Sequence, residues 1–103
     1  EMPILYSEYG IESEIPLEKA GIYRGGETSR PVPEEVQASY YRLAFELAAC
    51  QPTVVGLLLF LAVDEKRLDR WQSGIYYGDN EPKTSQPPVK AAIERIQKGG
   101  VRC

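Results

Sequence analysis

Val54-Val55-Gly56-Leu57-Leu58-Leu59-Phe60-Leu61 is the stretch that decides the fold class. It is continuously apolar, with Pro52 shortly before it and Asp64-Glu65 shortly after it. A run without alternating polar residues is typical of a parallel strand that is covered on both faces. We therefore predict a buried parallel strand over this stretch.

A helix is expected directly before this strand. Pro33-Glu34-Glu35 combines a proline with two acids, a pattern that favours the first turn of a helix. Apolar residues then recur at intervals of three and four, at Val36, Tyr40, Leu43, Ala44, Leu47 and Ala48. The helix should end near Cys50-Gln51-Pro52, because the residue before a proline disfavours helical geometry.

Another strand is predicted earlier in the chain, over residues 3–9, where apolar residues again occupy both odd and even positions. Residues 10–33 are rich in Gly and Pro and are expected to form a long loop of functional importance. A second long loop is expected over residues 64–86. A last helix should follow from Pro87-Pro88 to Lys98, where Gly99-Gly100 ends it.

The order of elements is strand, long loop, helix, tight turn, strand, long loop, helix. Long loops after strands and a short helix-to-strand turn are typical of a (β/α)8 barrel, whose strand-to-helix loops form the active face. A doubly wound sheet has a similar order, and two units do not separate the two folds. Two strands alone leave unpaired edges and little core, so we expect the isolated chain to be unstable or to associate.

Composition excludes several classes of protein. The 103 residues include 12 Lys and Arg against 15 Asp and Glu, and the scattered bases do not suggest a nucleic-acid-binding protein. The sequence has no His, which removes the Ser-His-Asp triad and the usual zinc ligand. The longest apolar stretch, residues 54–63, is too short to span a bilayer. Cys50 and Cys103 lack the spacing of a metal knuckle and are expected either to pair or to stay reduced.

Three segments carry a resemblance to a known family. Tyr6-Ser7-Glu8-Tyr9-Gly10 resembles the end of the seventh strand in retaining (β/α)8-barrel glycoside hydrolases, the clan of cellulases, β-mannanases and β-xylosidases. Residues 54–64 are similar to the eighth strand, and Arg70-Trp71-Gln72-Ser73-Gly74-Ile75-Tyr76-Tyr77 is similar to the segment leading into the last helix. The resemblance implies an α/β fold in which residues 1–103 are the seventh and eighth strand-helix units, the C-terminal portion of a TIM barrel.

The resemblance implies that Glu8 is the catalytic nucleophile. Retaining glycosidases use two carboxyl groups about 5–5.5 Å apart, one attacking the anomeric carbon and the other exchanging protons. The alternative is that Glu8 caps the strand or pairs with Arg24 or Arg30. A carboxylate at the carboxyl end of a barrel strand favours the catalytic role.

The second catalytic carboxyl group is expected in upstream sequence. In the family it is a Glu after an Asn at the end of the fourth strand. Asn80-Glu81-Pro82 has those letters, but it follows no apolar strand and lies in a polar segment, so we predict a solvated turn there. The chain begins at Glu1 with strand-like sequence close behind, as if cut from a longer protein, and by itself we expect it to be inactive.

Four further residues are candidates for binding a carbohydrate substrate: Trp71, Tyr9, Asp64 and Glu65. The indole of Trp71 suits stacking against a sugar ring, and its alternative role is to cover the barrel rim or the last helix. Asp64 and Glu65 should end the second strand on the same face as Glu8, where they either bind sugar hydroxyls or anchor the loop. Tyr76 and Tyr77 are expected to pack against the barrel, and Glu12, Glu14 and Glu18 to lie in a solvated loop.

The resulting hypothesis is a piece of a glycoside hydrolase that cleaves O-glycosidic bonds with retention. Its partners would be an oligo- or polysaccharide and the missing N-terminal part of the barrel, without nucleic acid, membrane, cofactor or metal. A non-catalytic carbohydrate-binding or structural barrel relative is the first alternative, and a free-standing α/β interaction module is the second. An extracellular location is suggested by the resemblance alone.

Overall fold

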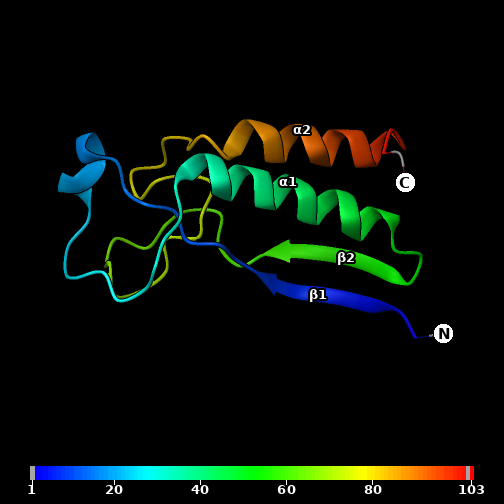
Figure 1. Cartoon of the computed structure of the whole chain (residues 1–103), viewed down its shortest axis with the longest axis horizontal. Helices are drawn as coiled ribbons and strands as arrows, with labels where there is room; N and C mark the ends of the chain where they lie inside the picture. Colours follow the sequence, from blue (N-terminus) through cyan, green and yellow to red (C-terminus); the bar gives the residue numbers. More distant parts are fainter. Residues whose placement is uncertain (1, 102) are drawn as a thin grey trace.

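The computed structural model describes residues 2–101 and 103. Glu1 and Arg102, which the predicted domain includes, lie outside the described residues. The elements follow the order β1 (Ile4–Tyr9), η1 (Leu17–Ile22), α1 (Glu34–Cys50), β2 (Val54–Leu59) and α2 (Gln86–Gln97). The two strands pair in parallel, and both helices lie on the same side of them (Figure 1). The predicted α/β order of two strand-helix units is therefore confirmed.

The two strands run in an irregular register. Ile4 pairs with Val54, Leu5 with Gly56, Tyr6 with Leu57 and Tyr9 with Leu59. Between the last two pairs β1 advances three residues while β2 advances two. The extra residue in β1 is a bulge, which bends a strand and turns the following side chains to the other face.

The core lies between α1, α2 and the helix-facing side of the strands. Tyr41, Phe45, Val89 and Ala92 form its buried cluster, and Tyr9, Leu57 and Leu59 from the strands pack against it. Tyr41, Phe45 and Ala48 lie at intervals of four and three and form the buried face of α1. Three residues of the predicted apolar spacing are instead exposed, namely Tyr40, Leu43 and Leu47. Pro87 and Pro88 lie in the first turn of α2, where a proline costs no backbone hydrogen bond.

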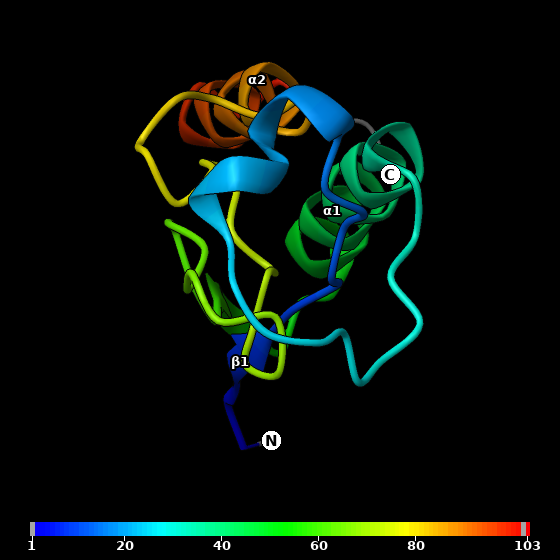
Figure 2. The same cartoon turned by 90° about the vertical axis from the view of Figure 1, so that its left-hand side faces the viewer.

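The loops that follow the strands gather at one end of the molecule, while the tight turn between α1 and β2 lies at the other end (Figure 1). Figure 2 views the loop end, with η1 in front of the helices. Isolated bridges join Ser13 with Val32 and Arg24 with Arg67. The second bridge and the hydrogen bond from the Ser13 N–H to the Gln72 carbonyl tie the two loops to each other.

Three expectations from the sequence need correction. Residues 10–33 are not wholly a loop, because η1 forms at Leu17–Ile22 after Pro16. The second strand ends at Leu59 rather than at Leu61, because the backbone N–H of Phe60 makes the last contact with β1, to the Tyr9 carbonyl. Asp64 and Glu65 therefore do not end the strand. They lie beyond it, in the loop between β2 and α2.

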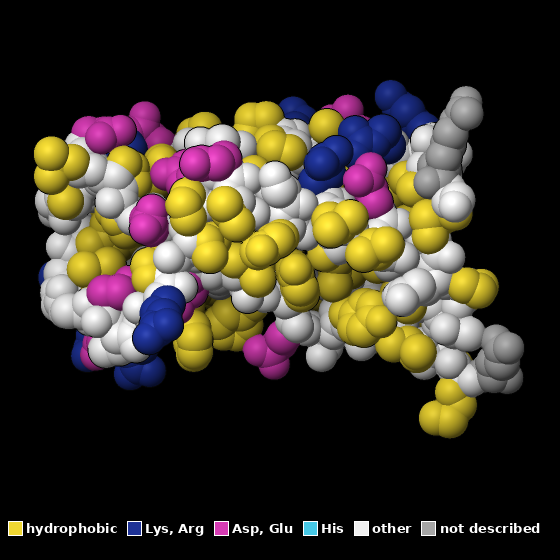
Figure 3. All heavy atoms as spheres, in the orientation of Figure 1, with side chains coloured by type: hydrophobic (Ala, Val, Ile, Leu, Met, Phe, Trp, Pro, Cys, Tyr) yellow, Lys and Arg dark blue, Asp and Glu magenta, His cyan; other side chains and the backbone are white. Residues whose placement is uncertain are grey.

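The strands are covered on the helix side only. Leu5 is 52% exposed on β1, and Val55 and Leu58 are 69% and 53% exposed on β2. Figure 3 shows hydrophobic side chains gathered in a band across the middle of the molecule. Leu43 and Leu47 of α1 also have exposed side chains. The expectation of two covered faces is therefore not met within the described residues.

Cys50 and Cys103 form a disulfide, which resolves the alternatives left open by the sequence. Cys50 is the last residue of α1, and Cys103 follows α2, so the bond joins the ends of the two helices. No helix of the described part of the chain is long and apolar enough to cross a membrane.

Candidate functional site

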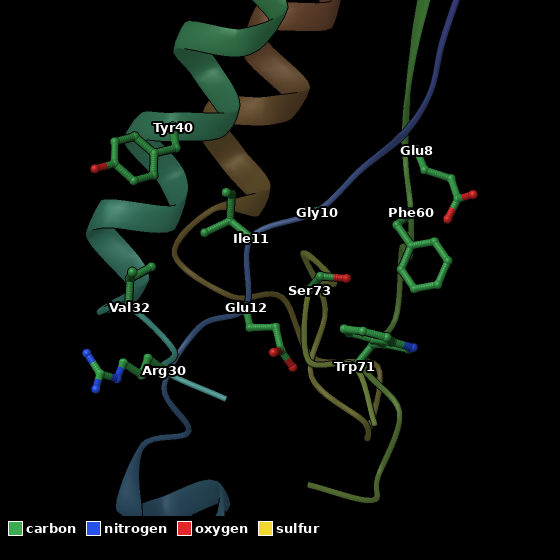
Figure 4. A pocket seen from close by; sticks show the side chains of 10 residues that line it. All are labelled: Glu8, Gly10, Ile11, Glu12, Arg30, Val32, Tyr40, Phe60, Trp71 and Ser73. Carbon is green, nitrogen blue, oxygen red and sulfur yellow. The ribbon is translucent and has the colours of Figure 1, made fainter. Parts of the chain in front are cut away.

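A pocket of about 480 Å³ opens at the loop end of the strands. Its size falls within the range of about 300–1,000 Å³ that is usual for small-molecule sites. Figure 4 shows ten side chains that line it: Glu8, Gly10, Ile11, Glu12, Arg30, Val32, Tyr40, Phe60, Trp71 and Ser73. The residues come from β1, both strand-to-helix loops and α1, so only the folded chain brings them together.

Glu8 reaches this pocket because of the bulge in β1. Tyr6 faces α1, since its hydroxyl donates to the side chain of Gln51, and regular alternation would turn Glu8 to the same side. The extra residue instead turns Tyr9 towards α1, where its ring meets Tyr41 edge-on at 5.8 Å. Glu8 therefore faces away from the helices, into the pocket (Figure 4).

Trp71 lies on the same side of the pocket as Glu8 (Figure 4). Its ring packs edge-on against Phe60, with 5.8 Å between centroids, and half of the residue stays exposed. The backbone of Trp71 is fixed on both sides by Glu65, whose N–H donates to the Trp71 carbonyl and whose carboxylate accepts from the Trp71 N–H at 3.1 Å. An indole face is thus held in position at the pocket.

Glu12 and Ser73 are two of the eight lining residues that the sequence did not single out as binding residues. Glu12, expected in a solvated loop, is half-buried at the pocket wall, where its carboxylate accepts hydrogen bonds from Ser29 Oγ and from the Gln72 N–H. Ser73 is 2% exposed and lies against Gly10. A Cβ at Gly10 would lie only 3.2 Å from the Ser73 side chain, so the glycine permits this close approach. In the sequence Ser73 was marked only by its place between Trp71 and Gly74, in the segment that resembles the lead into the last helix.

A buried ion pair links the two loops that line the pocket. Lys83 Nζ is 2.8 Å from the Asp64 carboxylate, and neither side chain is exposed. The ammonium also donates to Ser13 Oγ at 2.7 Å and to the Gln72 carbonyl at 3.2 Å. Asp64 accepts further hydrogen bonds from the Tyr23 hydroxyl at 2.7 Å and the Gly74 N–H at 2.9 Å. This pair connects both long loops.

Burial and mutual attraction shift the pKa values of Asp64 and Lys83 in opposite directions. Removal from water raises the pKa of the Asp64 carboxyl, and it lowers the pKa of the Lys83 ammonium. Their mutual attraction opposes both shifts, and every partner of Asp64 donates to it. We therefore assign both groups as charged, with the pair acting as a structural anchor.

The candidate binding residues are divided between different places. Glu8 and Trp71 share the pocket, whereas Tyr9 packs against the core cluster and Asp64 is buried in the ion pair. Glu65 lies in a separate groove with Arg67 and Arg70. A role in substrate binding stays a prediction for Tyr9, Asp64 and Glu65.

Asn80-Glu81-Pro82 forms the predicted turn. The N–H of Asn80 donates to the Tyr77 carbonyl at 2.9 Å, and the Glu81 side chain pairs with Lys19. Glu81 does not line the pocket of Glu8. Tyr77 is buried, as expected, with its hydroxyl donating to Glu34. The described residues contain no group of three or more side chains suited to hold a metal ion.

Comparison with solved structures identifies the fold. The β-glucuronidase of Bifidobacterium dentium, in complex with coumarin-3-O-glucuronide, is similar with a TM-score of 0.61 and 24% identity over 92% of this chain. The β-glucuronidases of Faecalibacterium prausnitzii (TM-score 0.61, 21% identity, 98% of this chain) and Ruminococcus gnavus (0.62, 22%, 93%) are also similar. The chain has the fold of part of a (β/α)8 barrel.

The match covers only a small part of each known structure. The chain spans 15% of the Bifidobacterium chain and 16% of the Faecalibacterium and Ruminococcus chains. These neighbours are glycoside hydrolases. No protein-family model matches the sequence, and no curated protein matches it.

Proposed function

We propose that this chain supplies the seventh and eighth strand-helix units of a retaining (β/α)8-barrel glycoside hydrolase, with Glu8 as the nucleophile. The proposal rests on one observation. The Glu8 side chain faces away from the helices and lines a pocket at the loop end of the strands, on the same side as the exposed indole of Trp71. In a barrel, the loop end of the strands is the active face. Similarity to barrel glycosidases supports the same conclusion.

The reaction requires an ionised carboxylate at the anomeric carbon. The Glu8 oxygen forms a bond to that carbon while the glycosidic C–O bond breaks and a second carboxyl group protonates the leaving oxygen. Water then attacks the same carbon, gives its proton to the second group and releases Glu8. Glu12 is not our candidate for the second group, because Ser29 and the Gln72 backbone occupy its carboxylate. We assign that group to the rest of the barrel.

Two apolar grooves flank the strands and support a larger assembly. One of about 300 Å³ runs along β1 and α1 and includes Tyr6, Leu43 and Leu47. The other, of about 380 Å³, runs along β2 and α2 and includes Val55, Ile93 and Ile96. In a closed barrel both edges are paired with neighbouring units. We therefore propose that the remaining units of the barrel cover these grooves in the whole protein.

The experiment is a trapping reaction in the whole protein. A 2-deoxy-2-fluoroglycoside with a good leaving group slows release of the covalent intermediate, so peptide mass spectrometry should find the sugar on Glu8. Glu8→Gln should remove labelling and lower kcat by at least about 10³-fold, while circular dichroism stays unchanged. Glu14→Gln, which changes an exposed acid outside the pocket, is the matched control and should keep activity. Labelling of another residue, or near-normal turnover by Glu8→Gln, would sink the assignment.

A further inference from the structure

We propose that Ser73 is a further carbohydrate-binding residue, whose hydroxyl exchanges a hydrogen bond with a hydroxyl of a neutral sugar ring stacked on Trp71. This inference rests on the proposed function and adds a contact and a substrate class to it. It starts from an unusual feature of the pocket wall, namely a buried hydroxyl without a partner.

The hydroxyl of Ser73 is buried but not satisfied. The residue is 2% exposed, and its Oγ has no hydrogen-bond partner among the described residues. Buried polar groups in folded proteins are nearly always paired, so an unpaired one at a pocket wall indicates a group that a ligand pairs with. Ser73 lines the pocket, and its hydroxyl points towards the side that carries Glu8, Phe60 and Trp71 (Figure 4).

The backbone around Ser73 is held in place. The Ser73 carbonyl accepts a hydrogen bond of 2.6 Å from the Tyr41 hydroxyl, inside the core. The next residue, Gly74, donates its N–H to Asp64 at 2.9 Å, and the preceding residue, Gln72, donates its N–H to Glu12 at 3.1 Å. A hydroxyl on such a rigid segment loses little freedom when it binds a ligand, which favours specific recognition.

Trp71 and Ser73 suit two features of a sugar ring. A pyranose has an apolar face of C–H groups, which stacks on an indole, and a rim of hydroxyl groups, which needs hydrogen bonds. Trp71 is half exposed, and the Phe60 ring stands perpendicular to it, so part of the indole remains open. Because Ser73 is two positions along the same segment, both contacts come from one short stretch of chain.

The charges at this side of the pocket favour a neutral sugar. Glu8 and Glu12 contribute two carboxylates, and like charges placed close together repel. Arg30 is the single cation among the described lining residues, and its guanidinium points away from Trp71 (Figure 4). A ring bound between Glu8, Ser73 and Trp71 therefore meets negative and neutral groups, which disfavours a uronic acid.

The test uses the whole protein with five 4-nitrophenyl β-glycosides, namely glucoside, galactoside, mannoside, xyloside and glucuronide. We expect at least one neutral glycoside to be cleaved with a kcat/KM tenfold or more above that of the glucuronide. Ser73→Ala should lower kcat/KM for that glycoside by about tenfold, chiefly through KM, the size expected for one lost hydrogen bond. Monodeoxy versions of that glycoside each lack one hydroxyl group. For the version that lacks the hydroxyl bound by Ser73, wild type and Ser73→Ala should have the same kcat/KM.

Ser85→Ala is the matched control. Ser85 is also fully buried with an unpaired hydroxyl, but it does not line the pocket, so its variant should leave kcat/KM unchanged. Equal kcat/KM for wild type and Ser73→Ala, with Glu8→Gln inactive, would overturn this inference and leave the proposed function standing. A preference for the glucuronide would overturn the neutral-sugar assignment. Full activity of Glu8→Gln, or no cleavage of any of the five glycosides, would overturn both.

Discussion

The ammonium of Lys83 lies 2.8 Å from the carboxylate of Asp64, and both side chains are completely buried. The pair joins the two ends of the loop between β2 and α2, and Ser13 brings the loop after β1 to the same ammonium. Because Gly74 and Gln72 bind the same two charges, the pair sets the position of the segment that carries Trp71 and Ser73.

Removing one member of this pair should be costly. Lys83→Met leaves an uncompensated buried carboxylate and is expected to lower the free energy of unfolding by about 3–5 kcal/mol, measured by urea denaturation of the whole protein. The double variant Lys83→Met with Asp64→Asn should lose less, because no buried charge remains. Arg67→Met breaks an ion pair with Asp69 in which both side chains are well exposed and should cost less than about 1 kcal/mol. Equal losses for Lys83→Met and Arg67→Met would contradict the anchoring role.

Glu34 should make the stability depend on pH. Burial alone would raise the pKa of Glu34, but hydrogen bonds from the Tyr77 hydroxyl and the Thr84 N–H outweigh it and hold the pKa below its ordinary value of 4.5. A depressed carboxyl pKa stabilises the fold above the unfolded pKa, and the stabilisation is lost as pH falls through the folded pKa. Glu34→Gln should therefore be less stable than wild type, and this loss of stability should be largest above about pH 5 and shrink below about pH 4.

The measurement for Glu34 is a series of melting temperatures between pH 3 and pH 7. Glu35→Gln is the matched control, since Glu35 is exposed in the same first turn of α1 and should cost at most a few tenths of a kcal/mol. If the melting temperature of Glu34→Gln fell further below that of wild type as the pH falls, the assigned direction of the pKa shift would be contradicted.

The disulfide between Cys50 and Cys103 should stabilise the last strand-helix unit. It closes a loop with a sequence separation of 53, for which the loss of unfolded-state freedom corresponds to about 4 kcal/mol at most. Dithiothreitol should lower the melting temperature of the wild type and leave that of the Cys50→Ser, Cys103→Ser double variant unchanged. Alkylation of both thiols in the untreated native protein would show that the bond is absent.

The isolated 103-residue chain should not behave as a stable monomer. Within the described residues each strand has one unpaired edge, and large side chains such as Leu47, Val55 and Leu58 are more than half exposed. Such edges and patches lead to association. Size-exclusion chromatography with light scattering should show oligomers or aggregates at micromolar concentration. A monomer with a sharp, cooperative melting transition would contradict this expectation.

The sequence by itself determined the strands, the helices and their order. The continuous apolar run from Val54 to Leu61 and the three-and-four spacing of α1 are local patterns, and local patterns predict the type of an element. The buried face of α1 was not predicted, because Leu43 and Leu47 are exposed while Tyr41 is buried. Prolines marked both ends of α1, which begins at Glu34 directly after Pro33 and ends at Cys50 shortly before Pro52. The short helix η1 was missed because its six residues carry no long apolar period.

Only the tertiary structure decided which side chains meet. The β1 bulge that turns Glu8 into the pocket depends on the register of two strands about 50 residues apart, and a one-residue change of register exchanges the faces of a strand. The disulfide and the pairing of Lys83 with Asp64 likewise join positions that no local pattern connects. Ser73 became a candidate only when its burial and its lack of a partner were known. Local propensity acts over a few residues, whereas a binding site is defined by distances across the folded chain.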